Sequence, residues 1–357
     1  MLPRMRASTP LLVACDIDGT LVRTGSPATA AVRSAATQVR AAGHHMVLAT
    51  GRSLTGALPV ARQLGLDDAW IVASNGAVTA HLVGDHYQVT EQHDLDAEVA
   101  IRVTVAAAPG VRIAAEMVGT GYRVNIPFPE YELNGDQHSV RGLEELWAHP
   151  TPRIALQGPS GYRLVWALRA LGLTAIATRR DWVDVTAAEI SKATALEKVR
   201  TELGVEPGDT IAVGDSENDV AMLDWAAHGW AMGHAPAFVI AGADYVTGTL
   251  DDDGAAAVLL SLSDSLGSCA SHVSRPGSPL SSMPTSRPVS SASSGPTAAS
   301  TTTVAWASIA PVSCSKHPMA GPCTGRPSSA AALRATPSTG RRRSSRATRL
   351  RRSRPSS

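Results

Sequence analysis

Residues 11–21 read L-L-V-A-C-D-I-D-G-T-L, an apolar run that ends in two aspartates and a glycine. A short, wholly apolar run is typical of a parallel strand that is buried on both faces. Asp16 and Asp18 stand two residues apart where the chain leaves this strand, and Gly19 would let the chain turn sharply after them. The alternative is an ordinary turn, because Asp-Gly is a common turn dipeptide.

Strands and helices alternate on both sides of a less regular middle segment. Before it, the pattern predicts strands at 11–17, 46–49 and 70–73 and helices at 28–42 and 54–64. After it, the pattern predicts strands at 182–185, 210–213 and 230–232 and helices at 192–203, 218–225 and 254–262. Such alternation indicates an α/β fold with a doubly wound, Rossmann-like parallel sheet.

The middle segment, residues 81–180, has short ambiguous strands, several Gly and Pro breaks and one clear helix near 162–171. We therefore expect a core made of residues 10–80 and 181–262, interrupted by an inserted α/β domain of residues 81–180.

A second strand end carries polar residues. The sequence A-T-G-R-S places Thr50 at the end of the strand at 46–49, followed by Gly51 and Arg52. A hydroxyl and a guanidinium can both bind phosphate oxygens. The alternative is that this segment only begins the next helix, with Ser53 as its N-cap.

A third strand end, V-G-D-S-E-N-D, places Asp215 after the strand at 210–213, with Asn218 and Asp219 in the next turn. Acids so close repel one another unless a cation lies among them, and Mg²⁺ favours such oxygen ligands. The alternative is an acidic helix start that is stabilised by the helix dipole.

Lys192 is one of only two lysines in residues 1–262, a region that otherwise uses arginine for positive charge. This scarcity suggests a need for a compact ammonium group at that position. The alternative is a solvated lysine in the first turn of a helix.

Together these elements resemble the four motifs of the haloacid dehalogenase superfamily of phosphohydrolases, in the same order. The matching segments are D-I-D-G-T (16–20), Thr50 in A-T-G-R-S, Lys192 in E-I-S-K-A-T-A-L, and G-D-S-E-N-D-V-A-M-L (214–223). S-N-G-A at 74–77 and the large insertion between Thr50 and Lys192 resemble the Cof-type branch, which carries an α/β cap domain. The resemblance covers about residues 10–262.

The resemblance implies a Mg²⁺-dependent phosphatase that cleaves small phosphomonoesters, such as sugar phosphates, through an aspartyl-phosphate on Asp16. It implies that Asp18 transfers protons and that Thr50 and Lys192 hold the phosphoryl group. The implied metal ligands are Asp16, the backbone carbonyl of Asp18, and Asp215. Asn218 and Asp219 would orient the ligands and the lysine, and the residues implied to bind substrate are Gly51, Arg52, Asn75, Lys192 and Asn218.

Two other functions remain open. A sugar phosphomutase or phosphotransferase would use the same aspartyl-phosphate but pass it to a sugar. A nucleic-acid-binding protein would act through the basic C-terminal end, with binding that weakens as salt rises. A nucleotide-binding ATPase is disfavoured, because the chain has no G-x-x-x-x-G-K.

Residues 263–357 differ from the rest of the chain in composition. They contain 25 Ser, 11 Pro and 12 Arg, and their 13 basic residues face a single acid, whereas residues 1–262 hold 19 basic and 30 acidic residues. Such a segment cannot bury enough apolar surface to fold, so we expect a disordered tail. Either it is a natural basic tail, which would contact nucleic acid or anionic membrane, or the reading frame of a GC-rich gene has shifted near residue 262.

The cellular location is predicted from the lack of a signal peptide and of a membrane-spanning segment in the sequence. Residues 1–14 have no long apolar run or cleavage site typical of a signal peptide, and no run of 18 apolar residues occurs. The four cysteines form no C-x-x-C pair, which disfavours a zinc site or a disulfide framework. We expect a cytoplasmic protein that binds a small phosphorylated metabolite and no membrane.

Overall fold

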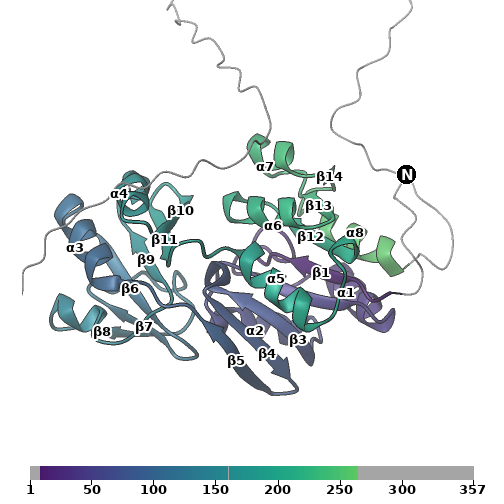
Figure 1. Ribbon diagram of the computed structural model, residues 1–357, viewed down its shortest axis with the longest axis horizontal. Coiled ribbons are helices and arrows are strands. Elements are labelled where there is room, and N and C mark those ends of the chain that lie inside the picture. The colour runs from purple at the N-terminus through teal and green to yellow at the C-terminus, as the bar shows by residue number, and fades with distance from the viewer. Residues whose placement is uncertain (1–8, 160, 264–357) are drawn as a thin grey trace, which may run out of the picture. The chain divides into compact units, whose positions relative to one another are not determined.

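The structure, a computed structural model of the chain, describes residues 9–263 apart from residue 160. Within these residues the principal strands form two separate sheets (Figure 1). The described part closes with the predicted last helix, α8 (Gly254–Ser263). The tail predicted to be disordered lies beyond α8, outside the described residues, and so do residues 1–8.

The first sheet is mainly parallel, as the alternating pattern predicts. Its strands are β1 (Leu12–Cys15), β2 (His45–Ala49), β3 (Asp68–Ala73), β4 (Val78–Val83), β5 (His86–Gln92), β12 (Thr210–Gly214), β13 (His228–Ala231) and β14 (Tyr245–Val246). They lie in the order β14-β13-β12-β1-β2-β3-β4-β5. Neighbours from β14 to β3 are parallel, and β4 and β5 extend the sheet as antiparallel strands.

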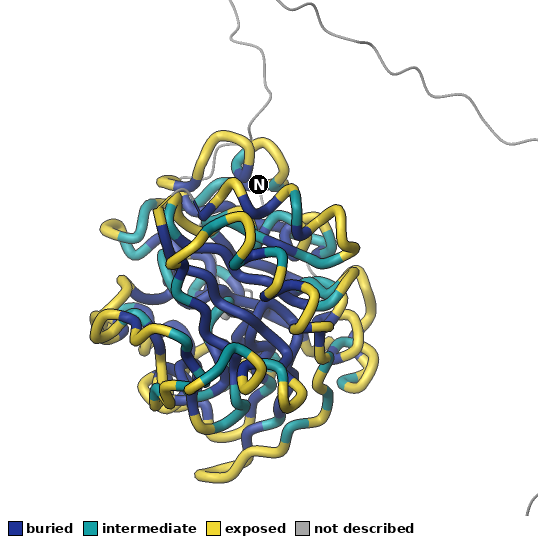
Figure 2. Tube along the Cα trace, turned by 90° about the vertical axis from the view of Figure 1, so that its left-hand side faces the viewer, coloured by how far each residue is buried: buried dark blue, intermediate teal, exposed yellow. Residues whose placement is uncertain are grey.

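Helices cover both faces of this sheet, because successive side chains of a strand point to opposite faces. Val13 and Cys15 pack on one face, against α1 (Ala30–Ala41), α2 (Leu54–Gln63) and α8. Leu12 and Ala14 pack on the other. That second face is covered by α5 (Lys192–Glu202), α6 (Val220–Trp225) and α7 (Ala237–Gly242). The sheet therefore forms the middle layer of the predicted doubly wound core, and Figure 2 shows buried strands inside partly exposed helices and loops.

The second sheet is mixed and has its own helices. Its strands are β6 (Arg112–Met117), β7 (Gly121–Val124), β8 (Asp136–Ser139), β9 (Ile154–Gln157), β10 (Thr174–Arg179) and β11 (Trp182–Thr186). They lie in the order β10-β11-β9-β6-β7-β8, antiparallel except for the pair β7–β8. Helices α3 (Ala97–Ala107) and α4 (Leu164–Ala170) pack on it through a separate apolar cluster. This is the α/β cap sheet expected within the insertion.

The two sheets divide the chain at different points from those predicted from the sequence. The sequence predicts the strand at 182–185 in the core, but as β11 it pairs with β9 and β10 of the cap sheet. The sequence predicts residues 81–92 in the cap, but β4 and β5 pair with the core sheet. The reason is physical: an apolar strand has the same pattern in either sheet, and its partners are chosen by contacts distant in sequence.

The helix boundaries agree with the predictions to within a few residues. The helix predicted at 28–42 begins after Thr29, whose hydroxyl accepts a hydrogen bond from the Val32 amide at 3.2 Å. Short 3-10 turns occur at η1 (Ser74–Gly76), η2 (Leu143–Leu146), η3 (Gly161–Arg163), η4 (Pro207–Asp209) and η5 (Glu217–Asp219). Among the described residues, no helix has both the length and the apolar character needed to cross a bilayer.

Candidate active site

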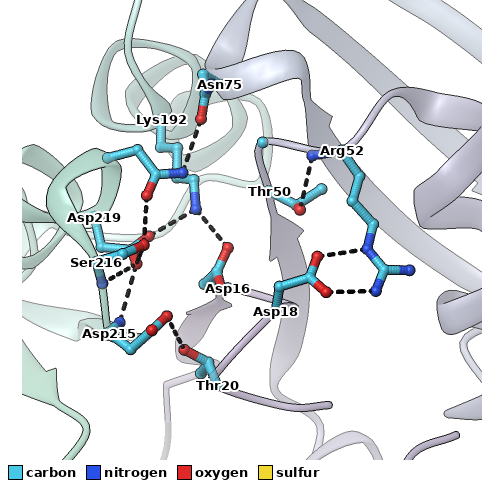
Figure 3. A network of polar contacts seen from close by, with 12 residues as sticks. Asp16, Asp18, Thr20, Thr50, Arg52, Asn75, Lys192, Asp215, Ser216 and Asp219 are labelled. Atoms are coloured by element: carbon cyan, nitrogen blue, oxygen red, sulfur yellow. Dashed lines mark hydrogen bonds and ion pairs between the residues drawn. The ribbon is translucent and has the colours of Figure 1, made fainter. Parts of the chain in front are cut away.

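Asp16 leaves the carboxyl end of β1 at the centre of the parallel sheet. Its backbone amide donates to the carbonyl of Val213 at 3.0 Å, which extends the pairing of β1 with β12 by one residue. Only 3% of the residue is exposed. Because parallel strands end at the same edge of a sheet, Asp16, Thr50 and Asp215 are brought together from three separate segments (Figure 3).

Lys192 reaches this edge from the first residue of α5. Its Nζ lies 2.6 Å from Asp16 Oδ1 and 2.6 Å from Asp219 Oδ1, and the side chain is completely buried. This burial excludes the alternative of a solvated lysine. Burial alone would lower the pKa of Lys192, but the charges of Asp16 and Asp219 outweigh it and raise the pKa, so the ammonium stays charged.

Asp219 fixes both the lysine and the loop that carries Asp215. Its Oδ2 accepts from the backbone amides of Asp215 and Ser216, each at 3.0 Å, while its Oδ1 accepts from Lys192. Gly19 packs directly against the Asp215 carboxylate, because a Cβ on Gly19 would lie 2.4 Å from Asp215 Oδ2. Its φ of +82° also favours glycine.

Three carboxylates converge at this edge of the sheet, and the Lys192 ammonium supplies positive charge against them. Oxygens of Asp16, Asp215 and Asp219 lie within 4.8 Å of one another. Burial, and then repulsion from Asp219, raise the pKa of Asp215 to about 7, and burial raises the pKa of Asp16 against the opposing effect of Lys192. A divalent cation with hard oxygen ligands would relieve this excess of negative charge, so the residues present fit a metal site. Because both Asp219 oxygens already accept hydrogen bonds, Asp16 and Asp215 are the carboxylates that can turn toward a cation.

Asp18 points away from this acidic group and pairs with Arg52, as Figure 3 shows. Arg52 Nε lies 2.6 Å from Asp18 Oδ2, and Nη2 lies 2.7 Å from Asp18 Oδ1. The side chain of Asp18 is therefore separate from the three converging carboxylates. The two carboxylates of D-I-D have different neighbours, which is the arrangement that separate roles require.

Thr50 and Ser53 flank Arg52 and differ in what they contact. The Thr50 hydroxyl is buried and accepts the backbone amide of Arg52 at 3.1 Å. Ser53 precedes α2 as predicted, but its side chain does not cap the helix. Instead its hydroxyl donates to the carbonyl of Asn134 at 3.2 Å. The alternative prediction, that the Ser53 side chain caps the next helix, is therefore wrong.

The turn after β3 reaches the same place through Asn75, which contacts Asn218 of the Asp215 loop. Asn218 Nδ2 donates to Asn75 Oδ1 at 2.9 Å, and Ser216 Oγ donates to Asn218 Oδ1 at 2.7 Å. Gly51 passes close by, since a Cβ on it would lie 3.2 Å from Asn75 Oδ1. All the residues singled out in the sequence thus lie in one connected region.

Two further side chains, Cys15 and His234, lie next to this group of carboxylates. Cys15 is fully buried, and burial raises the pKa of its thiol to about 12, in keeping with a packing role. His234 accepts the Leu250 amide through Nδ1 at 3.2 Å, a structural contact, but its Nε2 lies 3.8 Å from Asp215 Oδ2. The sequence carried no signal for this second contact, because residue 234 follows a different strand.

A buried polar cluster in the cap sheet, which contacts the core, has little recognisable signal in the sequence. Arg153 bonds to the carboxylates of Glu116 and Asp184 and to the backbone carbonyl of Gly51. These are isolated charged residues in strand segments and belong to no motif. Only the alternation of W-V-D-V-T (182–186) could have drawn attention to Asp184, as a charge between apolar residues.

Comparison with known proteins identifies the family. The sequence profile of the haloacid dehalogenase-like hydrolases matches residues 13–115 and 167–259, which hold every site residue described above except Glu116 and Arg153 of the cap cluster. The chain belongs to this family. It is therefore an enzyme of the hydrolase class, and its two sheets match the core and the α/β cap expected for the Cof-type branch.

Three similar proteins illustrate the family. The chain is 27% identical over 257 residues to the 5-amino-6-(5-phospho-D-ribitylamino)uracil phosphatase YcsE of Bacillus subtilis. The aligned region covers 69% of this chain and 92% of that protein. It is 31% identical over 245 residues to the phosphoglycolate phosphatase of Natronomonas pharaonis. That aligned region covers 68% of this chain and 93% of the other protein. The solved structure of a HAD subclass IIB sugar phosphatase has the same fold, with a TM-score of 0.61 at 24% identity, covering 71% of this chain and 98% of the other.

Proposed function

We propose that this HAD enzyme hydrolyses small phosphomonoesters in a Mg²⁺-dependent reaction, with Asp16 as the nucleophile and an aspartyl-phosphate as the intermediate. The chain is a HAD-type phosphatase, a phosphoric monoester hydrolase, and its substrate is a phosphorylated small molecule. The observation that carries the proposal is the position of Asp16. It lies buried at a strand end, 2.6 Å from the Lys192 ammonium and within reach of Asp215.

The first step transfers the phosphoryl group to Asp16. A carboxylate oxygen of Asp16 attacks phosphorus, the ester P–O bond breaks, and Asp18 gives a proton to the leaving oxygen. Lys192 remains cationic and neutralises charge on the transferring group, which is most of what phosphoryl transfer requires of a protein. In this step we expect the Thr50 hydroxyl and the side chains of Arg52 and Asn218 to bind phosphoryl oxygens.

The second step releases phosphate. A water oxygen attacks the phosphorus of the intermediate, Asp18 takes a proton from that water, and the bond between phosphorus and the Asp16 oxygen breaks. Asp18 thus acts first as an acid and then as a base, so each turnover restores its starting state. Asp219 keeps Lys192 and the 215–216 loop in place through both steps.

Mg²⁺ would be held by Asp16, the backbone carbonyl of Asp18, and Asp215, and when bound it supplies charge neutralisation between the carboxylate and the phosphoryl group. This assignment rests on the convergence of the Asp16 and Asp215 oxygens and on the raised pKa of Asp215.

For the substrate we propose a small polar phosphate ester, such as a sugar phosphate. YcsE is named for a phosphoribityl compound, and the relative from Natronomonas pharaonis for phosphoglycolate. Both names describe small polar molecules that carry one phosphate, and the two proteins share most of their length with this chain.

A phosphate-release screen tests the proposal. Purified protein with Mg²⁺ would be given a panel of sugar phosphates, phosphoglycolate and nucleoside monophosphates, with Asp16→Asn as the matched inactive control. We expect release from one or more esters by the wild type, none above background by Asp16→Asn, and none after chelation of Mg²⁺. Release by Asp16→Asn would contradict the nucleophile assignment. An isomeric sugar phosphate formed without phosphate release would identify the phosphomutase instead.

A further inference from the structure

Arg153 joins the cap to the core from a buried position just before β9, with 4% of the residue exposed. Its Nη1 donates to the backbone carbonyl of Gly51 in the core at 2.6 Å. Within the cap, its Nη2 donates to the Tyr122 hydroxyl at 2.7 Å. Its Nε lies 3.0 Å from Glu116 Oε2, and Nη1 lies 3.2 Å from Asp184 Oδ1. One guanidinium therefore links three cap side chains to a candidate substrate-binding loop.

The contact with Gly51 orients the peptide group between Gly51 and Arg52. A trans peptide is planar, and its carbonyl and amide point in opposite directions. Arg153 holds the Gly51 carbonyl on one side, and the Arg52 amide on the other side donates to the Thr50 hydroxyl oxygen at 3.1 Å. Rotation of this peptide would release both contacts, so Arg153 fixes the direction of the Thr50 hydroxyl.

The two cap carboxylates hold a strained turn of the core. Ser74 and Asn75 have φ values of 52° and 57°, in the left-handed region that is costly for residues other than glycine. Ser74 Oγ donates to Glu116 Oε2 at 2.7 Å, and Asn75 Nδ2 donates to Asp184 Oδ2 at 3.3 Å. Arg153 contacts both of these carboxylates, so it positions the groups that stabilise the turn.

The hydrogen bonds continue from the turn to the acidic loop. The Asn75 amide oxygen accepts from Asn218 Nδ2, and Asn218 accepts from Ser216 Oγ. The backbone amides of Ser74 and Asn75 also donate to the carbonyls of Arg52 and Thr50, at 2.7 Å and 3.0 Å. Contacts that begin at Arg153 therefore reach both the Thr50 loop and the loop of Asp215.

The composition of this cluster favours positioning over stability. Burying one cation with two carboxylates is no more stabilising than an apolar contact of the same size. Glu116 Oε1 is buried and has no hydrogen-bond partner among the described residues, which adds a further cost. What the cluster provides is direction, because its three charged side chains reach Gly51, Ser74 and Asn75 of the core only when cap and core have one relative orientation.

We propose that Arg153 is a positioning residue for the phosphatase reaction: it seats the cap on the Gly51 carbonyl and holds the Thr50 and Asn75 side chains in their reactive arrangement. The proposal rests on the proposed function for its effect on turnover, whereas its structural part is independent of it.

The test compares Arg153→Met with a triple variant, Glu116→Gln/Arg153→Met/Asp184→Asn. The single change leaves two buried carboxylates unpaired, so we expect a much lower melting temperature. The triple variant removes all three charges at nearly constant size and keeps acceptors for Ser74 and Asn75. We expect it to regain the wild-type melting temperature yet lose about 10- to 100-fold in kcat, with a smaller change in KM. The control is Arg102→Lys, which changes an exposed cap arginine paired with Glu98 and should retain the wild-type kcat.

Hydrogen exchange supplies a readout that needs no activity. In the triple variant we expect the Ser74 and Asn75 amides to exchange faster than in the wild type, with the amides of β2 unchanged. Wild-type kcat or wild-type exchange in the triple variant would overturn the proposal. A triple variant that stays unstable would assign the cluster to folding and overturn it as well. A wild type that releases no phosphate from any ester would refute the proposed function instead, and the exchange measurement would still decide the positioning role.

Discussion

The carboxylate of Asp18 and the guanidinium of Arg52 form a two-pronged ion pair, with contacts of 2.6 Å and 2.7 Å. Arg52 thus occupies both oxygens of the group that we assign to proton transfer. In the proposed mechanism Asp18 would donate a proton only after this pair opens, and another anion would draw Arg52 away from it. The phosphoryl group of the substrate is the anion that this site is proposed to bind, so substrate binding itself would free Asp18.

The role of Asp18 is tested by Asp18→Asn, which keeps the size of the side chain but removes the transferable proton. We expect kcat to fall by about 10²- to 10⁴-fold, the usual contribution of a general acid–base group, with a smaller change in KM. Steady-state phosphate release measures both. A kcat close to that of the wild type would assign proton transfer to another group.

The buried lysine is tested by Lys192→Met, which leaves Asp16 and Asp219 without their counter-charge. Breaking a buried ion pair costs about 3–5 kcal/mol in the free energy of unfolding, which urea denaturation can measure. The matched control is Lys198→Met on the exposed side of the same helix, where the pair with Glu91 is worth about 1 kcal/mol or less. Equal losses in the two variants would contradict the structural role of Lys192.

The metal site gives a pH-dependent prediction. Burial and the charge of Asp219 raise the pKa of Asp215 to about 7 without a cation, whereas an unfolded aspartate has a pKa of about 3.9. Between these values the folded chain keeps a proton that the unfolded chain has lost, so stability without metal falls as pH rises from about 4 to about 7.

Mg²⁺ must displace that proton, so the rise in melting temperature caused by Mg²⁺ should be small at pH 5 and grow to about pH 8. Thermal unfolding with and without Mg²⁺ measures it. In Asp215→Asn the rise should be small at every pH. An equal rise at pH 5 and pH 8 in the wild type would count against Asp215 as a ligand.

The seating of the cap gives a steric prediction. A Cβ on Gly56 of α2 would lie 2.7 Å from Cβ of Asn134 in the cap. Ala is normally favoured over Gly inside a helix by about 0.5–1 kcal/mol, yet here Gly56→Ala should displace the Asn134 segment and raise KM. Adding Asn134→Gly removes the opposing Cβ and should restore KM. A single variant with the wild-type KM would show that this contact is not needed for turnover.

The sequence predicted the strand-end residues well for a physical reason. Asp16, Thr50 and Asp215 each follow a buried apolar run, and parallel strands bring such ends to one edge whatever the loops do. The sequence could not predict that Asp18 faces Arg52, since that choice depends on side-chain geometry rather than on spacing.

The cap was predicted less well. Arg153 and Glu116 look like ordinary surface charges in the sequence, and together with Asp184 they become a site only through pairings between distant strands and a turn of the core. The strand at 182–185 was placed in the wrong sheet for the same reason, because its alternation sets which residues face inward but not which strand it joins.

The central claim is that Asp16 carries the phosphoryl group, and a trapping experiment tests it most directly. The wild type would be mixed with a substrate ester and Mg²⁺, quenched in acid during turnover and reduced with borohydride, which converts an aspartyl-phosphate to homoserine. Mass spectrometry of the tryptic peptide 7–23, which contains both Asp16 and Asp18, would locate the change. We predict homoserine at position 16 only. Homoserine at position 18, or an unmodified peptide from enzyme that is turning over, would contradict the account.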